Sequence, residues 1–149
     1  MLNAQSERLL SYPREALFDL AADIESYPQF LTGWISAHVY DRGAGFCRAE
    51  QTVGFGPVRI QFRSHALLQR PERLEITSDD SQFRHFRILW RFDPGEAGGH
   101  RVALGVELEL RSRLLQMWLD RLGPASAADA LKAFEQRARR VLGPTARSL

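Results

Sequence analysis

Cysteine and lysine are almost missing from this chain of 149 residues. Cys47 is the one cysteine, which excludes an internal disulfide and a metal site built from several thiolates. Nearly all the positive charge is arginine, because Lys132 is the one lysine. The arginines are scattered along most of the chain, so they form no basic stripe of the kind that binds DNA. A low cysteine content is typical of a reducing compartment, and we expect a cytoplasmic protein that does not bind DNA.

Long hydrophobic runs are also absent. No stretch approaches the roughly 20 apolar residues that span a bilayer, and the N-terminal region lacks the apolar core of a signal peptide. Hydrophobic residues still make up 44% of the chain and charged residues 26%, which are ordinary fractions for a globular domain. A chain of this length and composition is expected to fold around a core as one domain over residues 1–149.

Sequence patterns of metal sites and of catalysis are missing as well. The four histidines are far apart in the sequence and form no His-x-x-x-His pair. The chain contains no nucleophile elbow, no glycine-rich phosphate loop and no dinucleotide fingerprint. The sequence therefore predicts no metal, no cofactor and no catalytic residues, and the protein is not expected to be an enzyme.

Two long runs of alternating residues are the strongest positive signal. In Arg84–Phe92 the even-numbered positions from Phe86 onward are all apolar, and so are those in Val102–Leu110. A period of two predicts strands that have one face in the core and the other in water. Shorter segments at 5–12, 34–41, 46–55, 58–68 and 74–77 are further strand candidates. Short turns join most of them, which predicts an antiparallel meander.

Two other regions have helical periodicity. Pro13 opens the first, where apolar residues at helical spacing within Leu17–Ile24 predict a helix of about three turns. The second runs from residue 112 to 142 and is interrupted by Gly123-Pro124, so one kinked helix and two separate helices both stay open. Ser126 followed by Asp129 has the pattern of a helix cap. The C-terminal region is the expected cover for the dry face of the sheet, and a curved sheet around a helix can leave an apolar cavity.

Several motifs occur in a specific order and spacing along the chain. They are Pro13–Leu20, Asp23–Leu31, Val53–Phe55, Phe83-Arg84, Trp90–Phe92, Ser112–Leu115 and Ala133–Ala138. Together they resemble the coenzyme-Q-binding START-like family, which is often labelled polyketide cyclase or dehydrase and also contains ribosome-association toxin members. The resemblance covers about residues 5–143, and the chain departs from the family pattern at Thr32–Ile35 and Ser81-Gln82.

The resemblance implies an α+β helix-grip (START-like) fold. In this fold a curved antiparallel sheet of about six to seven strands surrounds a long C-terminal helix, and a small helix lies near the N-terminus. The implied function is a non-enzymatic carrier of a hydrophobic ligand, ubiquinone or a related isoprenoid lipid, in support of respiratory quinone function. Such a carrier is cytoplasmic and makes transient contact with the inner membrane.

Two other functions follow from the same resemblance. The first is a toxin-type module that binds the large ribosomal subunit, for which a pI of about 9.1 is a modest further indication. The second is a polyketide or aromatic cyclase, which is supported by the family label alone, and a fold label does not establish chemistry.

Strand parity and the resemblance together select the candidate site. Arg84 shares parity with Phe86, and a charged group on a dry face must be paired or must reach a ligand oxygen. An ion pair with Glu50 and a contact to a quinone carbonyl both stay open. The predicted cavity residues are Phe30, Val39, Phe62, Arg84, Phe86, Ile88, Trp90, Leu104, Val106, Leu131 and Phe134. The residues predicted at the cavity mouth, in contact with a membrane, are Leu31, Leu114, Met117 and Trp118, for which ordinary helix packing is the alternative.

Overall fold

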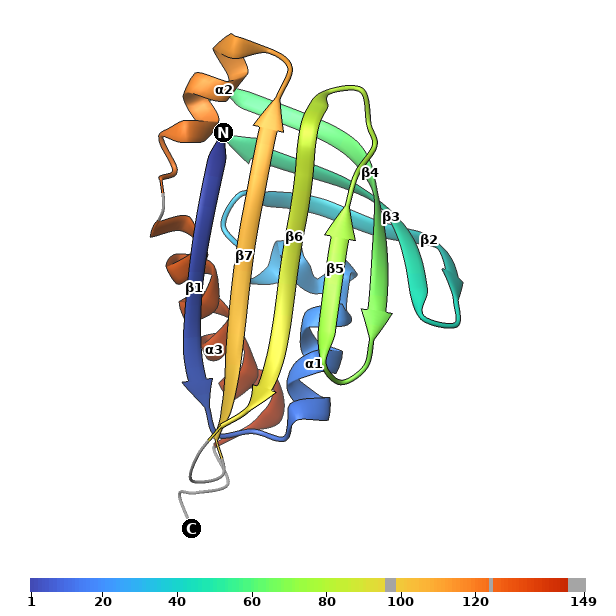
Figure 1. Cartoon of the computed structure of the whole chain (residues 1–149), viewed down its shortest axis with the longest axis vertical. Helices are drawn as coiled ribbons and strands as arrows, with labels where there is room; N and C mark the ends of the chain where they lie inside the picture. The colour runs from blue at the N-terminus through green and yellow to red at the C-terminus, as the bar shows by residue number, and fades with distance from the viewer. Residues whose placement is uncertain (96–98, 124, 145–149) are drawn as a thin grey trace.

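Strands form where apolar and polar side chains alternate, and they join into one antiparallel sheet (Figure 1). The structure, a computed structural model, describes residues 1–95, 99–123 and 125–144. Within these residues the sheet has seven strands in the order β1-β7-β6-β5-β4-β3-β2. The strands are Leu2–Leu10 (β1), Trp34–Gly43 (β2), Phe46–Phe55 (β3), Val58–Gln69 (β4), Arg73–Thr77 (β5), Phe83–Pro94 (β6) and His100–Leu110 (β7).

Helices occupy both regions where the sequence has helical periodicity. The helix predicted after Pro13 is α1 (Arg14–Ala22), and the 3₁₀ helix η1 (Ile24–Gln29) follows it. The C-terminal region forms two helices, α2 (Arg113–Asp120) and α3 (Ala125–Leu142). Gly123 lies between them with a φ of +68°, a conformation that glycine adopts without strain. The structure thereby settles the choice between one kinked helix and two separate helices.

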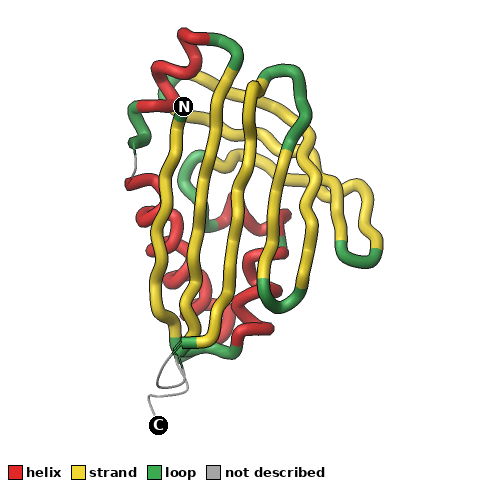
Figure 2. Tube along the Cα trace, in the orientation of Figure 1, coloured by secondary structure: helices red, strands yellow, loops and turns green. Residues whose placement is uncertain are grey.

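The helices α1 and α3 cover one face of the twisted sheet (Figures 1 and 2). Helix α3 packs against β1 and β7, and α1 packs against β5 and β6. The strands β2 and β3 run at a large angle to β1 and β7, so the sheet wraps around the helical layer (Figure 1). The predicted fold class is confirmed: an antiparallel sheet grips a long C-terminal helix.

An aromatic cluster fills one end of the space between helix and sheet. The ring of Phe134 on α3 lies 4.9 Å from the ring of Trp90, measured between centroids. Phe92 stacks on Trp90 at 6.4 Å and meets Phe18 of α1 edge-on at 5.8 Å. All four side chains are buried. This closed end joins α1, α3 and β6 into one core.

Most strands begin or end one or two residues away from the predicted boundaries, and the first strand differs most. The first strand begins at Leu2 rather than at residue 5, and Leu2 and Ala4 are buried. Pairing with β7 sets this start, since Leu2 lies opposite Leu108 in the ladder, a long-range contact that local sequence does not reveal. The hairpin loop predicted at 93–99 falls partly on residues 96–98, which lie outside the described residues, and β6 continues to Pro94.

Candidate functional site

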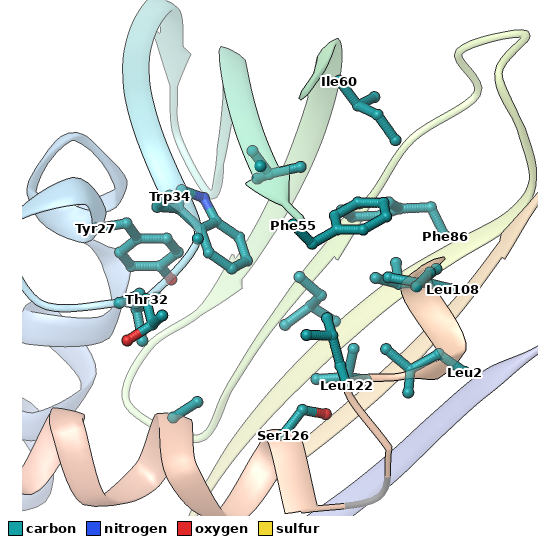
Figure 3. Close-up of a pocket in the computed structure, with 18 of the residues that line it drawn as sticks. Leu2, Tyr27, Thr32, Trp34, Phe55, Ile60, Phe86, Leu108, Leu122 and Ser126 are labelled. Carbon is teal, nitrogen blue, oxygen red and sulfur yellow. The ribbon is translucent and has the colours of Figure 1, made fainter. Parts of the chain in front are cut away.

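A cavity of about 470 Å³ lies between the concave face of the sheet and the first half of α3 (Figure 3). Its sides come from β3, β4, β6 and β7, and the end of α2 and the loop after η1 border it. The lining is predominantly apolar. The volume falls within the range of about 300–1,000 Å³ that is typical of small-molecule sites.

Six of the predicted cavity residues line this space. They are Phe62, Phe86, Ile88, Trp90, Leu104 and Val106. All come from β4, β6 or β7, the strands in which the alternation of apolar residues is most regular. Period-two alternation directs these side chains to the same face of the sheet, and that face is the concave one.

Four other predicted cavity residues are not among those that line the cavity. Phe134 and Leu131 are buried in the contact between α3 and the sheet. Phe30 packs against Tyr27, its ring centroid 5.8 Å from that of the tyrosine, and Val39 is a half-buried residue of the edge strand β2. Helical periodicity identifies the inward face of α3, but it does not distinguish the turns that touch the sheet from those that stand away from it.

The predicted position of Arg84 is wrong. A register shift between Phe83 and His85 interrupts the pairing of β6 with β7, so strand parity does not extend through this point. Phe83 is buried and lines the cavity, whereas Arg84 is exposed. The suggested partner Glu50 instead lies 3.7 Å from Arg63 and accepts a hydrogen bond from Gln61. The guanidinium of Arg84 therefore does not reach a ligand inside the cavity.

The residues predicted at the mouth fall into three groups. Leu31 lines the cavity and is buried. Trp118 packs over the turn between β3 and β4, so close to Gly56 that a Cβ there would lie 2.8 Å from the indole Cε3. Leu114 and Met117 are exposed on the outer face of α2. The mouth is bordered instead by exposed residues on three other segments, Thr32, Gly56 and Leu122.

Several lining residues were missed by sequence reasoning. Leu108 and Leu110 continue the alternation of Leu104, so strand parity alone could have found them. Ile60 shares parity with Phe62 and could have been found in the same way, whereas most of the others come from strand ends, from turns, and from short side chains of α3. The missed residues are Leu2, Tyr27, Thr32, Gly33, Trp34, Val53, Gly54, Phe55, Gly56, Ile60, Phe83, Leu108, Leu110, Leu119, Leu122, Ser126, Asp129, Ala130 and Ala133.

Few polar groups face this apolar space. Ser126 lies in the first turn of α3 rather than at its cap, and its buried Oγ has no hydrogen-bond partner in the described residues. Figure 3 shows the Ser126 side chain at the edge of the cavity, close to Leu122. Asp129, one turn further on, is exposed. The first half of α3 thus places a buried hydroxyl without a partner just behind the cavity wall, and an exposed carboxylate one turn further on.

Tyr27 and Trp90 contribute a second polar pair. The Tyr27 hydroxyl donates to the carbonyl of Ala21 at 2.6 Å. Burial raises the pKa of Tyr27 far above its usual range, and the nearby indole N–H of Trp90 offsets this only in part. The phenol therefore stays neutral. The indole Nε1 itself does not reach hydrogen-bond geometry with any group of the described residues.

Trp34, in contrast, is held by a chain of satisfied hydrogen bonds. Its Nε1 donates to Gln51 Oε1 at 2.7 Å, and Gln51 Nε2 donates to Ser64 Oγ at 2.7 Å. Gln51 and Ser64 are buried between β3 and β4. A buried amide with both ends paired fixes the orientation of the indole that borders the cavity.

Acidic, histidine and cysteine side chains do not converge anywhere in the described ranges 1–95, 99–123 and 125–144. No three of them lie close enough together to hold a metal ion. His85 pairs with Glu107 at 2.7 Å on the outer face of the sheet, away from the cavity. Cys47 is buried, and burial raises the pKa of its thiol. None of the helices in the described part of the chain is long and apolar enough to cross a bilayer.

The sequence matches a known family over most of its length. The model of the family described as polyketide cyclase/dehydrase and lipid transport matches residues 10–135. The chain belongs to this family. Among solved structures of similar fold, a Thermus thermophilus protein has a TM-score of 0.80 at 23% identity, over 93% of this chain and 97% of that one. A START superfamily protein of Mycobacterium smegmatis has a TM-score of 0.72 at 14% identity, over 93% and 98% of the two chains.

Two relatives of this chain have names that state different functions. The ribosome association toxin RatA of Pseudomonas aeruginosa is 28% identical over 139 residues, which cover 93% of this chain and 96% of that protein. The mitochondrial coenzyme Q-binding protein coq10 of Schizosaccharomyces pombe is 30% identical over 141 residues, which cover 91% of this chain and 85% of that protein. Family membership thus includes relatives named for a quinone ligand and relatives named for the ribosome.

Proposed function

We propose that this protein binds and carries a hydrophobic ligand, ubiquinone or a related isoprenoid lipid, without chemical change to that ligand. The observation that carries this proposal is the apolar cavity of about 470 Å³ between the sheet and α3. Each CH₂ group that moves from water into such a space stabilises the complex by about 0.8 kcal/mol. The relative named as a coenzyme Q-binding protein supports the same ligand class.

The unpartnered polar atoms of the wall suit a ligand with oxygen atoms on an apolar frame. A buried hydroxyl without a partner costs free energy, and rotation of the Ser126 side chain toward a ligand oxygen in the cavity removes that cost. A quinone ring carries such oxygens and its isoprenoid tail matches the apolar lining. In this proposal the protein supports respiratory quinone function through transient contact with the inner membrane.

Tryptophan fluorescence offers a direct test, because Trp34 and Trp90 both line the cavity. Titration with a short-chain ubiquinone is expected to quench their emission to saturation. Native mass spectrometry of protein purified from its own host, with organic extraction, is expected to find a quinone or lipid bound. Protein that neither quenches with quinones nor extracts them from vesicles would overturn the proposal.

A matched pair of substitutions on α3 separates cavity binding from surface effects. Ala130→Phe places an aromatic ring in the cavity wall, and it is expected to weaken quinone binding at least about tenfold by occupying the ligand's space. Ala128→Phe makes the same change at an exposed position of the same helix and is expected to leave binding unchanged. Equal affinities of the two variants would place the ligand outside the cavity.

A second candidate function is association with the large ribosomal subunit. The 28% identity to RatA over nearly the whole of both chains favours it, and so does the pI of about 9.1. This function makes no use of an internal cavity, which is why the carrier is the first proposal. Overexpression is expected to slow growth and block ribosomal subunit joining if this candidate is right. Unchanged growth and an unchanged ribosome gradient would exclude it.

A further inference from the structure

The short helix α2 exposes large hydrophobic side chains, although a globular fold usually buries such side chains. Leu114 is 66% exposed and Met117 is 61% exposed, the highest values for large hydrophobic residues in the described part of the chain. The two residues are three positions apart and therefore share one face of the helix. On the opposite face Leu119 is 3% exposed. Both faces of α2 thus carry apolar side chains. One face is buried against the fold, and the other is exposed to water.

Positive charge surrounds this outer face. Arg111, Arg113 and Arg121 are all exposed around the helix. The guanidinium of Arg121 lies 4.3 Å from the ring centroid of Trp118, a cation–π contact that keeps the charge at the edge of the apolar patch. The acidic side chain of α2 is Asp120, which accepts a hydrogen bond from Gln116 Nε2 at 2.8 Å. The face therefore combines an apolar centre with a basic rim.

The same helix borders the cavity from its inner side. Leu119, and Leu122 just beyond the helix, line the cavity. Figure 1 shows α2 at one end of the molecule, beyond the ends of β6 and β7 and away from α1. A flat partner can therefore reach the outer face of α2 without touching the rest of the helical layer, and it would then lie next to the cavity mouth.

We propose that α2 is a docking face for an anionic lipid bilayer. Leu114 and Met117 enter the boundary between head groups and acyl chains, and the arginines lie at the level of the lipid phosphates. Apolar side chains flanked by arginines on one helix face are the pattern of interfacial helices. RNA would use the arginines but would leave both apolar side chains without a partner. The proposal concerns the outer surface of α2 and holds whatever ligand the cavity carries.

Vesicle flotation tests this surface directly. Wild-type protein is mixed with vesicles of phosphatidylcholine alone or with vesicles that also contain phosphatidylglycerol. Binding is expected only to the anionic vesicles and is expected to weaken with added salt. The double substitution Leu114→Ser with Met117→Ser is expected to lower the partition coefficient about tenfold or more, and Arg113→Glu is expected to lower it and to remove part of the salt dependence.

A second double variant controls for loss of exposed apolar surface in general. Leu67→Ser with Val141→Ser changes side chains that are 45% and 51% exposed on other faces of the molecule, and its vesicle binding is expected to equal that of the wild type. Titration of every variant with a short-chain quinone reports separately on the cavity. Vesicle binding that is absent in the wild type, or equal in both double variants, overturns the proposal. Loss of ribosome association instead of vesicle binding in the α2 variant would assign the face to the ribosome and also overturn it.

Discussion

Ser126 is the residue at which function and stability are expected to oppose each other. Its Oγ is buried without a partner in the described residues, so Ser126→Ala removes an unsatisfied group and adds a better helix former. We expect the free energy of unfolding to rise by about 0.5–1 kcal/mol. If the hydroxyl bonds the ligand, quinone affinity is expected to fall about 2- to 10-fold, the value of one hydrogen bond.

Denaturant unfolding and fluorescence titration measure the two effects of Ser126→Ala independently. Ser36→Ala removes a hydroxyl from an exposed position of β2 and is the control for both. A variant that loses stability and keeps its quinone affinity would show that Ser126 has a structural role and does not contact the ligand.

Tyr27 is expected to make the fold sensitive to alkaline pH. Burial raises the pKa of its phenol above the ordinary value of 10.0, so the native state keeps a proton that the unfolded state loses above pH 10. The unfolded state then binds fewer protons, and the free energy of unfolding falls by about 1.4 kcal/mol per pH unit as the pH rises beyond 10.

Tyr27→Phe loses the hydrogen bond to Ala21, which lowers the free energy of unfolding by about 1 kcal/mol at neutral pH. The same substitution removes the pH dependence. Tyr40→Phe, at a side chain that is 46% exposed, is expected to keep the steep decline of the wild type in urea unfolding between pH 8 and 11.

The contact between α2 and the β3–β4 turn is expected to control access to the cavity, because both elements border it. Gly56 has a φ of +58°, and a Cβ at this position would lie 2.8 Å from Trp118. Gly56→Ala is therefore expected to displace α2 as well as to strain the turn, whose backbone cost alone is about 1–2 kcal/mol. Gly45→Ala imposes similar strain at a φ of +78°, where the nearest atom is 3.5 Å away. We expect both variants to lower Tm and Gly56→Ala alone to speed quinone dissociation in stopped-flow measurements. Equal dissociation rates would show that α2 does not gate the cavity.

The elements that sequence predicts best are those whose period repeats. Alternation in β4, β6 and β7 identified these strands and six residues of the cavity wall, because each repeat of the period adds to the same signal. Features that occur once were missed. The register shift beside Arg84 moves one side chain from one face to the other, and only pairing with β7 reveals it. Helix α3 has the predicted inward face, but its distance from the sheet decides that Ala130 lines a cavity while Leu131 is in the core, and a sequence period contains no such distance.

Over the whole molecule, the space between α3 and the sheet is packed at one end and hollow at the other, which predicts that stability and binding depend on opposite ends. The end around Trp90, Phe92 and Phe134 is filled by aromatic contacts that hold the helix. The other end, beside Ser126 and α2, is left open as the cavity. A helix that touched the sheet along its whole length would leave no cavity, and one without the aromatic contacts would not stay docked.

This division predicts different costs for the same truncation at the two ends. Leu131→Ala removes a side chain that is 1% exposed in the filled end, and we expect a loss of about 2–5 kcal/mol in the free energy of unfolding. Leu108→Ala acts on a half-buried side chain that already borders empty space, so it loses fewer packing contacts and is expected to cost at least about 1 kcal/mol less. Ligand binding is expected to show the opposite order of effects. Leu108→Ala enlarges the cavity and changes the preference between short-chain and long-chain quinones. Folded Leu131→Ala protein is expected to bind quinones like the wild type. Parallel urea unfolding and quinone titration of the two variants measure this contrast. If both lose stability and affinity to the same degree, the helix and its cavity form one cooperative unit and the division is wrong.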